Sequence, residues 1–276
     1  TRNPRFPMYV SLLTNVLNAL FSGLGIYVFR LGIVGVALGT VLARLVGVLI
    51  LWRELDLSTI RWRWGLDGEL LRLSLPAAGE RLMMRAGDVV IIAIVVVFGT
   101  DAVAGNAIGE VLTQFNYMPA FGVVTATVML VAHAVGEGDM QAVGLIRQRA
   151  FWLSFACMLP LALGIFALGR PLTLLYTDNS GAITASLSVI LFSLLGTPMA
   201  AGTVIYTAVW QGLGNARLPF YATTIGMWLI RIVSGYLLGV TFGLGLPGVW
   251  AGTLLDNGFR WLFLKVLFDR KMREIT

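Results

Sequence analysis

The sequence has little charge, one cysteine and one histidine. Only 12% of its 276 residues are charged, and 58% are hydrophobic, whereas roughly a quarter of the residues in a soluble domain are charged. The single Cys157 excludes a disulfide within the chain, and one cysteine with one histidine, His133, cannot form a zinc site. The same scarcity argues against an intramembrane enzyme. The composition therefore predicts a polytopic membrane protein.

Long apolar segments run through the whole sequence. A helix needs about 20 apolar residues to cross a bilayer, and the period-two alternation of membrane strands is absent. The prediction is an all-α polytopic membrane protein with eight transmembrane helices. The predicted helices are residues 8–29, 31–52, 70–98, 103–135, 150–168, 182–211, 219–240 and 247–268.

Basic residues concentrate in alternate loops. The opposite set of loops holds only Arg30 and Arg170. By the positive-inside rule the basic set faces the cytoplasm, so both ends of the chain are expected on the cytoplasmic side of the inner membrane. Topology then accounts for the net charge of +6, and no nucleic-acid partner is expected. The basic set comprises Arg2, Arg5, Arg53, Arg61, Arg63, Arg147, Arg149, Arg217, Arg270, Lys271 and Arg273.

An internal repeat links the first two predicted helices to the last two. The Arg, Pro and Tyr at positions 5, 7 and 9 recur at positions 217, 219 and 221, an offset of 212. After one inserted residue, LGIVGVALGTVL at 31–42 matches LGLPGVWAGTLL at 244–255. Both copies run in the same direction, so the repeat is parallel, with an axis along the membrane normal.

The repeat predicts how the chain is organised. Residues 1–53 are interpreted as the last two helices of a truncated N-terminal lobe, 54–69 as a cytoplasmic linker, and 70–276 as a complete C-terminal six-helix lobe. Four further helices are expected upstream, which would give an intact protein of twelve helices in two lobes.

Several longer motifs resemble the multidrug and toxic compound extrusion (MATE) transporters. They are SLPAAGERL, FGTDAVAGNAIGEVLTQFNYMPAFGV, LVAHAVGEGDMQAV, RPLTLLYTDNSGAI and QGLGNARLPFY. The resemblance implies a V-shaped, twelve-helix protein, monomeric at full length, that exports organic cations in exchange for H⁺ or Na⁺. The family often carries an essential acid on its first helix, which this chain lacks. Members of the family commonly have an apolar residue followed by a polar or basic one where this sequence has Glu110 and Val111. Some members bind sodium with acids on the equivalents of the third and sixth helices, but this sequence has Met84 in the third helix and no acid in the sixth.

The third predicted helix carries charge inside an apolar segment. Glu80, Arg81, Arg85 and Asp88 fall on one face of a helical wheel. Arg85 and Asp88 are three residues apart and can pair. Two interpretations remain open: an ion-paired seam between helices, or a carboxylate at Glu80 or Asp88 that faces a central cavity and exchanges its proton for substrate.

The fourth predicted helix has a single polar stripe. Asn106, Glu110, Gln114 with Thr113, and Tyr117 recur at spacings of three or four residues. No basic residue lies one turn from Glu110, which suits a group that binds and releases a coupling proton. The alternative is that Glu110 pairs with an arginine from another helix.

Polar residues also interrupt the sixth and eighth predicted helices. Asp256 and Arg260 are four residues apart and can form an internal pair, although Asp256 is also a candidate coupling residue. Tyr206, like Tyr117, would suit a cation if it lined the cavity.

Taken together, these features predict a secondary antiporter for small cationic or amphipathic compounds, working by alternating access with H⁺ or Na⁺ and no resident cofactor. Its other expected partner is the lipid bilayer. The alternative is a flippase of the related superfamily for lipid-linked precursors or polysaccharide units. A flippase should line its cavity with unpaired arginines, and the candidates are Arg81, Arg85, Arg231 and Arg260.

Overall fold

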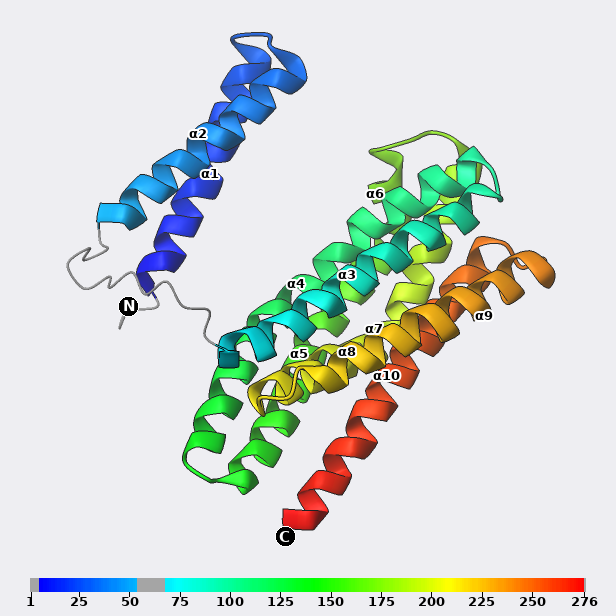
Figure 1. The fold of residues 1–276 in the computed structure, drawn as a ribbon. Helices are drawn as coiled ribbons and strands as arrows, with labels where there is room; N and C mark the ends of the chain where they lie inside the picture. The colour runs from blue at the N-terminus through cyan, green and yellow to red at the C-terminus, as the bar shows by residue number, and fades with distance from the viewer. Residues whose placement is uncertain (1–4, 54–67, 276) are drawn as a thin grey trace. The chain divides into compact units, whose positions relative to one another are not determined.

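A computed structural model describes residues 5–53 and 68–275 (Figure 1). The chain divides into two compact units, Thr1–Gly65 and Leu66–Thr276. All regular structure in the described residues is helical, as the sequence predicted. Most of the predicted linker at 54–69 lies outside the described residues, and its last two residues belong to the first helix of the second unit.

The first unit is a pair of helices, α1 (Arg5–Tyr27) and α2 (Gly32–Arg53). Arg30 and Gly32 turn the chain with positive φ angles of 52° and 54°. A Cβ on Gly35 would lie 2.7 Å from the backbone of Gly25, so glycine is required for this close approach. The Thr40 hydroxyl also donates to Asn18 Oδ1 at 3.0 Å, which joins the two helices by a polar contact.

The second unit contains the remaining helices. Two of them begin at side-chain caps, since Asp139 accepts a hydrogen bond from the backbone of Ala142, and Asn179 accepts from Gly181 and Ala182. In order, the elements are α3 (Gly68–Val96), α4 (Thr100–Gly136), α5 (Met140–Ala167), α6 (Gly169–Leu174), α7 (Ser180–Gly212), α8 (Arg217–Ile225), the π-helical turn η2 (Gly226–Arg231), α9 (Ile232–Tyr236), the π-helical turn η3 (Leu237–Thr241) and α10 (Leu246–Ile275).

Helix α7 lies at the centre of this unit, in contact with α4, α5 and α10 (Figure 1). Gly105 and Gly109 of α4 lie directly against Ser186 and Val189 of α7. Small residues allow two helix backbones to approach closely, so van der Waals packing is extensive where the hydrophobic effect between membrane helices is weak. This packing gives the second unit a fixed frame for the charged residues described below.

Each of the eight predicted segments overlaps helical structure, and four of them, 8–29, 31–52, 70–98 and 150–168, extend one or two residues beyond a helix end. Six stretches in the described residues are long and apolar enough to cross a membrane: α1, α2, α4, α5, α7 and residues 217–241. Helices α3 and α10 are outside this set, and both carry several charges. Helix α5 begins ten residues earlier than predicted. The prediction followed the apolar segment alone, whereas the first turns of the helix are polar and contain Arg147 and Arg149. The short α6 was not predicted.

Candidate functional site

Charged side chains from three elements of the second unit form a cluster, which we call the charged seam. It consists of three acids and two bases: Glu80 and Asp88 from α3, Arg231 from η2, and Asp256 and Arg260 from α10. Acids and bases alternate through this seam. Arg260 interacts electrostatically with both Glu80 and Asp256, and Arg231 does the same with Asp256 and Asp88. Such alternation lowers the cost of burying charge, because buried charges are tolerated when they are paired.

Asp88 lies between two arginines. Its Oδ2 is 3.5 Å from Arg85 Nη1, and its Oδ1 is 3.5 Å from Arg231 Nη1. The predicted Arg85–Asp88 pair is confirmed. The Arg231 side chain is only 11% exposed whereas that of Arg85 is 84% exposed, so the contact with Arg231 is the more shielded from solvent. It joins α3 to η2.

Arg231 is the last residue of the π-helical turn η2. A π turn accommodates one extra residue in a helix and often marks a functional position. Arg231 Nε donates to Thr253 Oγ1 of α10 at 3.1 Å, in addition to its contact with Asp88. One side chain therefore connects α3, η2 and α10.

Asp256 and Arg260 form the most buried ion pair of the seam. Arg260 Nη2 donates to Asp256 Oδ2 at 2.8 Å, and the two side chains are 6% and 0% exposed, respectively. This confirms the predicted internal pair. A Cβ on Gly226 would overlap Asp256 Oδ1, so η2 needs glycine there. Asp256 Oδ1 and Arg260 Nε are buried and have no hydrogen-bond partner among the described residues.

Glu80 occupies the seam about two turns before Asp88 on α3. It accepts a hydrogen bond from Thr223 Oγ1 of α8 at 3.1 Å. Arg260 and Arg81 both act on its charge. Glu80 and Asp88 were predicted to lie on one face of α3. In the structure Glu80 contacts α8 and Asp88 contacts the next element, η2.

Glu110 lies on α4 beside the seam. Its Oε1 accepts from Asn106 Nδ2 at 3.2 Å, and Asn106 Oδ1 in turn accepts from Trp250 Nε1 at 2.9 Å. Glu110 is exposed, and no ion pair involves it in the part of the chain that the structure describes. The charges of Arg231 and Asp88 nevertheless act on it. Glu110 is thus a hydrogen-bonded, accessible carboxylate next to a shielded ion pair.

The other predicted site residues lie in different environments. Gln114 is exposed on α4, and Tyr117 packs against the buried cluster that contains Ala120 and Met158. Tyr206 is 4% exposed, and its hydroxyl accepts a hydrogen bond from Arg147 Nη1 of α5 at 2.7 Å. Glu80, Asp88 and Asp256 are therefore brought together, with Glu110 beside them, whereas Tyr206 belongs to a separate pocket between α5, α7 and α10.

The MatE family model matches residues 76–237, which is more than half of the chain and includes most of the seam. The chain belongs to the MatE family. The resemblance seen in the motifs is confirmed, and with its membrane-length helices this MatE chain is a multi-pass membrane protein.

Two curated relatives illustrate the similarity. The MatE chain is 32% identical to a probable multidrug resistance protein NorM of Thermotoga maritima, over 96% of this chain and 59% of the relative. It is 24% identical to the uncharacterized transporter YisQ of Bacillus subtilis, over 93% of this chain and again 59% of the relative. The chain therefore spans about three-fifths of the length of these relatives.

Solved structures show the same fold. A crystal structure of MATE in the straight conformation matches with a TM-score of 0.84 and 20% identity, over 97% of this chain and 62% of that one. A MOP superfamily transporter from Pyrococcus furiosus, described as having a binding pocket of reverse polarity, matches with a TM-score of 0.86 and 21% identity, over 96% of this chain and 62% of that one.

Sequence reasoning missed the position of Arg231 in this MatE chain. It was considered only as an arginine that could line a flippase cavity, yet it contacts Asp88 from a segment more than 140 residues further along. The one usable signal was Thr253, which lies on the polar face of α10 and accepts its hydrogen bond. The pairing of Arg231 with Asp88 depends on the rotation of η2 about its axis. The spacing of residues along one helix does not reveal that rotation.

Proposed function

We propose that this chain is the larger part of a two-lobed, twelve-helix secondary transporter that exports cationic or amphipathic compounds in exchange for H⁺ or Na⁺. Its family, the multidrug resistance names of its relatives, its share of their length and its parallel repeat support this proposal. Helices α3 and α10 have 29 and 30 residues, more than the about 20 that a crossing needs, and most of their seam charges are paired. Eight crossings follow in this proposal.

In the same proposal residues 1–53 contribute two helices to the N-terminal lobe, and residues 70–276 form the C-terminal lobe. Both ends face the cytoplasm, which agrees with the distribution of arginine and lysine. The protein works as a monomer in the inner membrane without a resident cofactor.

The observation that carries the proposal is the state of Glu110. It is a carboxylate on a helix long and apolar enough to span the membrane, it is exposed, and it has no basic partner among the described residues. A proton or Na⁺ and a cationic substrate would each neutralise this carboxylate, so they would compete for it. Competition between two ligands for one site gives obligatory exchange when the site changes sides of the membrane only while one of them is bound. Asp88 and Arg231 adjust its charge environment.

The test is driven efflux of a fluorescent cation, such as ethidium, by the Glu110→Gln variant. Glutamine keeps the size and the hydrogen bond with Asn106 but cannot exchange a proton or bind Na⁺ by charge, so driven efflux should fall by about tenfold or more while expression is retained. Glu137→Gln is the matched control, because Glu137 is exposed beyond the end of α4 and its side chain lies 3.5 Å from His133. Efflux equal to that of the control would remove Glu110 from the mechanism.

The coupling ion can be assigned with the same protein in proteoliposomes. A pH gradient imposed without sodium and a sodium gradient imposed at constant pH are compared for their ability to drive ethidium movement. Movement under only the first gradient identifies H⁺, and movement under only the second identifies Na⁺. Movement under neither would contradict the antiport proposal.

The flippase alternative has less support. A cavity for anionic lipid-linked substrates needs unpaired cationic side chains, whereas Arg85, Arg231 and Arg260 each contact an acid. Arg231 and Arg260 are therefore paired within the seam, and Arg85 shares Asp88 with Arg231. The accessible carboxylate of Glu110 lies beside these pairs.

A further inference from the structure

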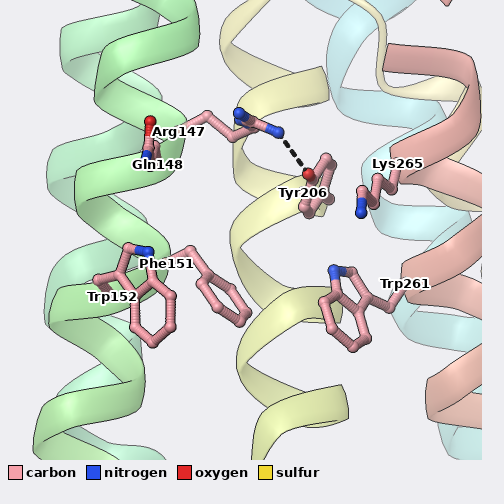
Figure 2. A pocket seen from close by; sticks show the side chains of 7 residues that line it. All are labelled: Arg147, Gln148, Phe151, Trp152, Tyr206, Trp261 and Lys265. Atoms are coloured by element: carbon pink, nitrogen blue, oxygen red, sulfur yellow. Dashed lines mark hydrogen bonds between the residues drawn. The ribbon is translucent and has the colours of Figure 1, made fainter. Parts of the chain in front are cut away.

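A second site lies between α5, α7 and α10, away from the charged seam. It is a pocket of about 260 Å³ (Figure 2). Arg147, Phe151 and Trp152 line it from α5, Tyr206 from α7, and Trp261 and Lys265 from α10. Two cations and four aromatic rings therefore surround one small space.

The pocket contains hydrogen-bond donors that lack acceptors. Arg147 Nε and Trp261 Nε1 are buried and have no partner among the described residues. Figure 2 shows the indole nitrogen of Trp261 turned toward Tyr206, with the ammonium of Lys265 beside the same ring. No ion pair involves Lys265 in the described part of the chain. Buried donors without acceptors are costly, so these groups fit a ligand that is rich in acceptors.

The charge of the pocket favours an anion. Arg147 is partly neutralised by Asp269, whose Oδ1 lies 3.8 Å from Arg147 Nη1, and it donates to Tyr206 Oη at 2.7 Å. Lys265 adds a second positive charge, so two bases share the single acid Asp269. The site therefore has a net positive charge, which opposes the cationic compounds proposed as transport substrates and attracts negatively charged groups.

The walls of the pocket suit the membrane interface. Phe151 and Trp261 stack with ring centroids 5.6 Å apart and an interplanar angle of 14°, and Trp152 is 58% exposed. Tryptophan and tyrosine concentrate at headgroup level. Arg147 is seven residues from the start of α5 at Met140, or about 10 Å at 1.5 Å per residue. This end of the unit also carries Arg270 and Lys271, so it belongs to the side predicted to face the cytoplasm.

We propose that this pocket binds the phosphate headgroup of an anionic phospholipid from the cytoplasmic leaflet. Lys265, Arg147 and the Trp261 indole would donate to the phosphate oxygens, while the aromatic rings contact the glycerol and the first carbons of the acyl chains. Basic pockets between membrane helices bind anionic headgroups in this way. The volume is below the roughly 300–1,000 Å³ of pockets for drug-sized ligands, and it matches a headgroup better than a transported drug. This lipid site does not depend on the proposed transport activity.

The test is native mass spectrometry of the purified protein titrated with phosphatidylglycerol or phosphatidylcholine. Phosphatidylglycerol should bind more tightly, and Lys265→Gln should weaken its binding by about tenfold, as expected for loss of a charged hydrogen bond. Trp261→Phe keeps the ring but removes the donor, and a loss of about threefold is expected. The matched control is Lys271→Gln, since Lys271 lies over the Trp210 ring outside the pocket, 5.6 Å from its centroid.

Two results would overturn the proposal. One is equal affinity for the two phospholipids, or an equal effect of Lys265→Gln and Lys271→Gln, because the headgroup would then not be read by this pocket. The other is displacement of phosphatidylglycerol by millimolar inorganic phosphate in the wild-type protein but not in Lys265→Gln, because the pocket would then be a site for a free anion.

Discussion

Two helical hairpins in this chain share a sequence pattern and differ in charge: α1 with α2, and the run from α8 to η3 with α10. Their turns contain Gly32 and Gly245, both with positive φ, at 54° and 64°. A Cβ on Gly35 would lie 2.7 Å from the backbone of Gly25, and a Cβ on Gly248 would lie 2.6 Å from Gly239. The repeat therefore preserves the close approach of two backbones.

The difference appears about two to three turns further along the same hairpins. At the positions of Asp256 and Arg260 the first hairpin has Ala43 and Gly47, and at the position of Gly226 it has Thr14. A Cβ on Gly47 would overlap the Thr14 side chain, whereas a Cβ on Gly226 would overlap Asp256 Oδ1. In the first hairpin the first helix carries the side chain and the second carries glycine, whereas in the second hairpin this arrangement is reversed. The repeat thus provides a common scaffold, and the second copy makes room in it for a buried ion pair.

Removing one member of that ion pair should have the largest effect on stability. Asp256→Ala leaves Arg260, whose side chain is 6% exposed, without its acid, and an unpaired buried charge costs about 3–5 kcal/mol. We expect a large fall in the melting temperature of the purified protein in detergent. Glu137→Ala is the control, because its contact with His133 is solvent-exposed and such pairs contribute about 0–1 kcal/mol. Similar melting temperatures for the two variants would show that Arg260 does not depend on Asp256.

Rebuilding the first hairpin inside the second should recover most of that loss. The triple variant Gly226→Thr, Asp256→Ala, Arg260→Gly recreates the arrangement of Thr14, Ala43 and Gly47. The threonine would then occupy space that the carboxylate of Asp256 and the Cγ and Cδ atoms of Arg260 no longer fill. Replacing a buried ion pair by packed apolar groups is often neutral or stabilising. The triple variant should therefore melt above both Asp256→Ala and Gly226→Thr, and purely additive losses would contradict the exchange of volume between helices.

The same comparison shows what the sequence could and could not predict. The glycine pattern revealed the repeat, and the spacings of three and four predicted the Arg85–Asp88 and Asp256–Arg260 pairs, because both features depend only on one helix. The contact between Asp88 and Arg231 depends on the rotation that the π-helical turn η2 gives to the chain. The pocket at Arg147 depends on three helices meeting. Neither arrangement has a signature in the spacing of residues along one helix.

Equivalent glycines should respond equally in the two hairpins. Gly35→Ala and Gly248→Ala each place a methyl group within 2.7 Å of the facing backbone, which has to move. Overpacking of this kind costs about 1–3 kcal/mol, so both variants should lower the melting temperature by similar amounts. Gly122→Ala in α4 is the control, because nothing lies within 4 Å of the added methyl and alanine favours a helix by about 1 kcal/mol. A loss at only one of the two repeat positions would show that the hairpins are not mechanically equivalent.

The smallest expected difference in stability concerns Thr40 and Thr253, which occupy equivalent positions in the two copies of the repeat. Thr253 Oγ1 accepts from the guanidinium of Arg231 at 3.1 Å, whereas the Thr40 hydroxyl donates to the neutral Asn18 Oδ1 at 3.0 Å. Hydrogen bonds to charged groups contribute about 1.5–3 kcal/mol and neutral ones about 0.5–1.5. Thr253→Val should therefore destabilise the protein more than Thr40→Val in a comparison of melting temperatures. The reverse order would mean that the contact of Arg231 with Asp88 alone suffices to hold it, and that the hydroxyl of Thr253 is retained from the repeat without contributing to the seam.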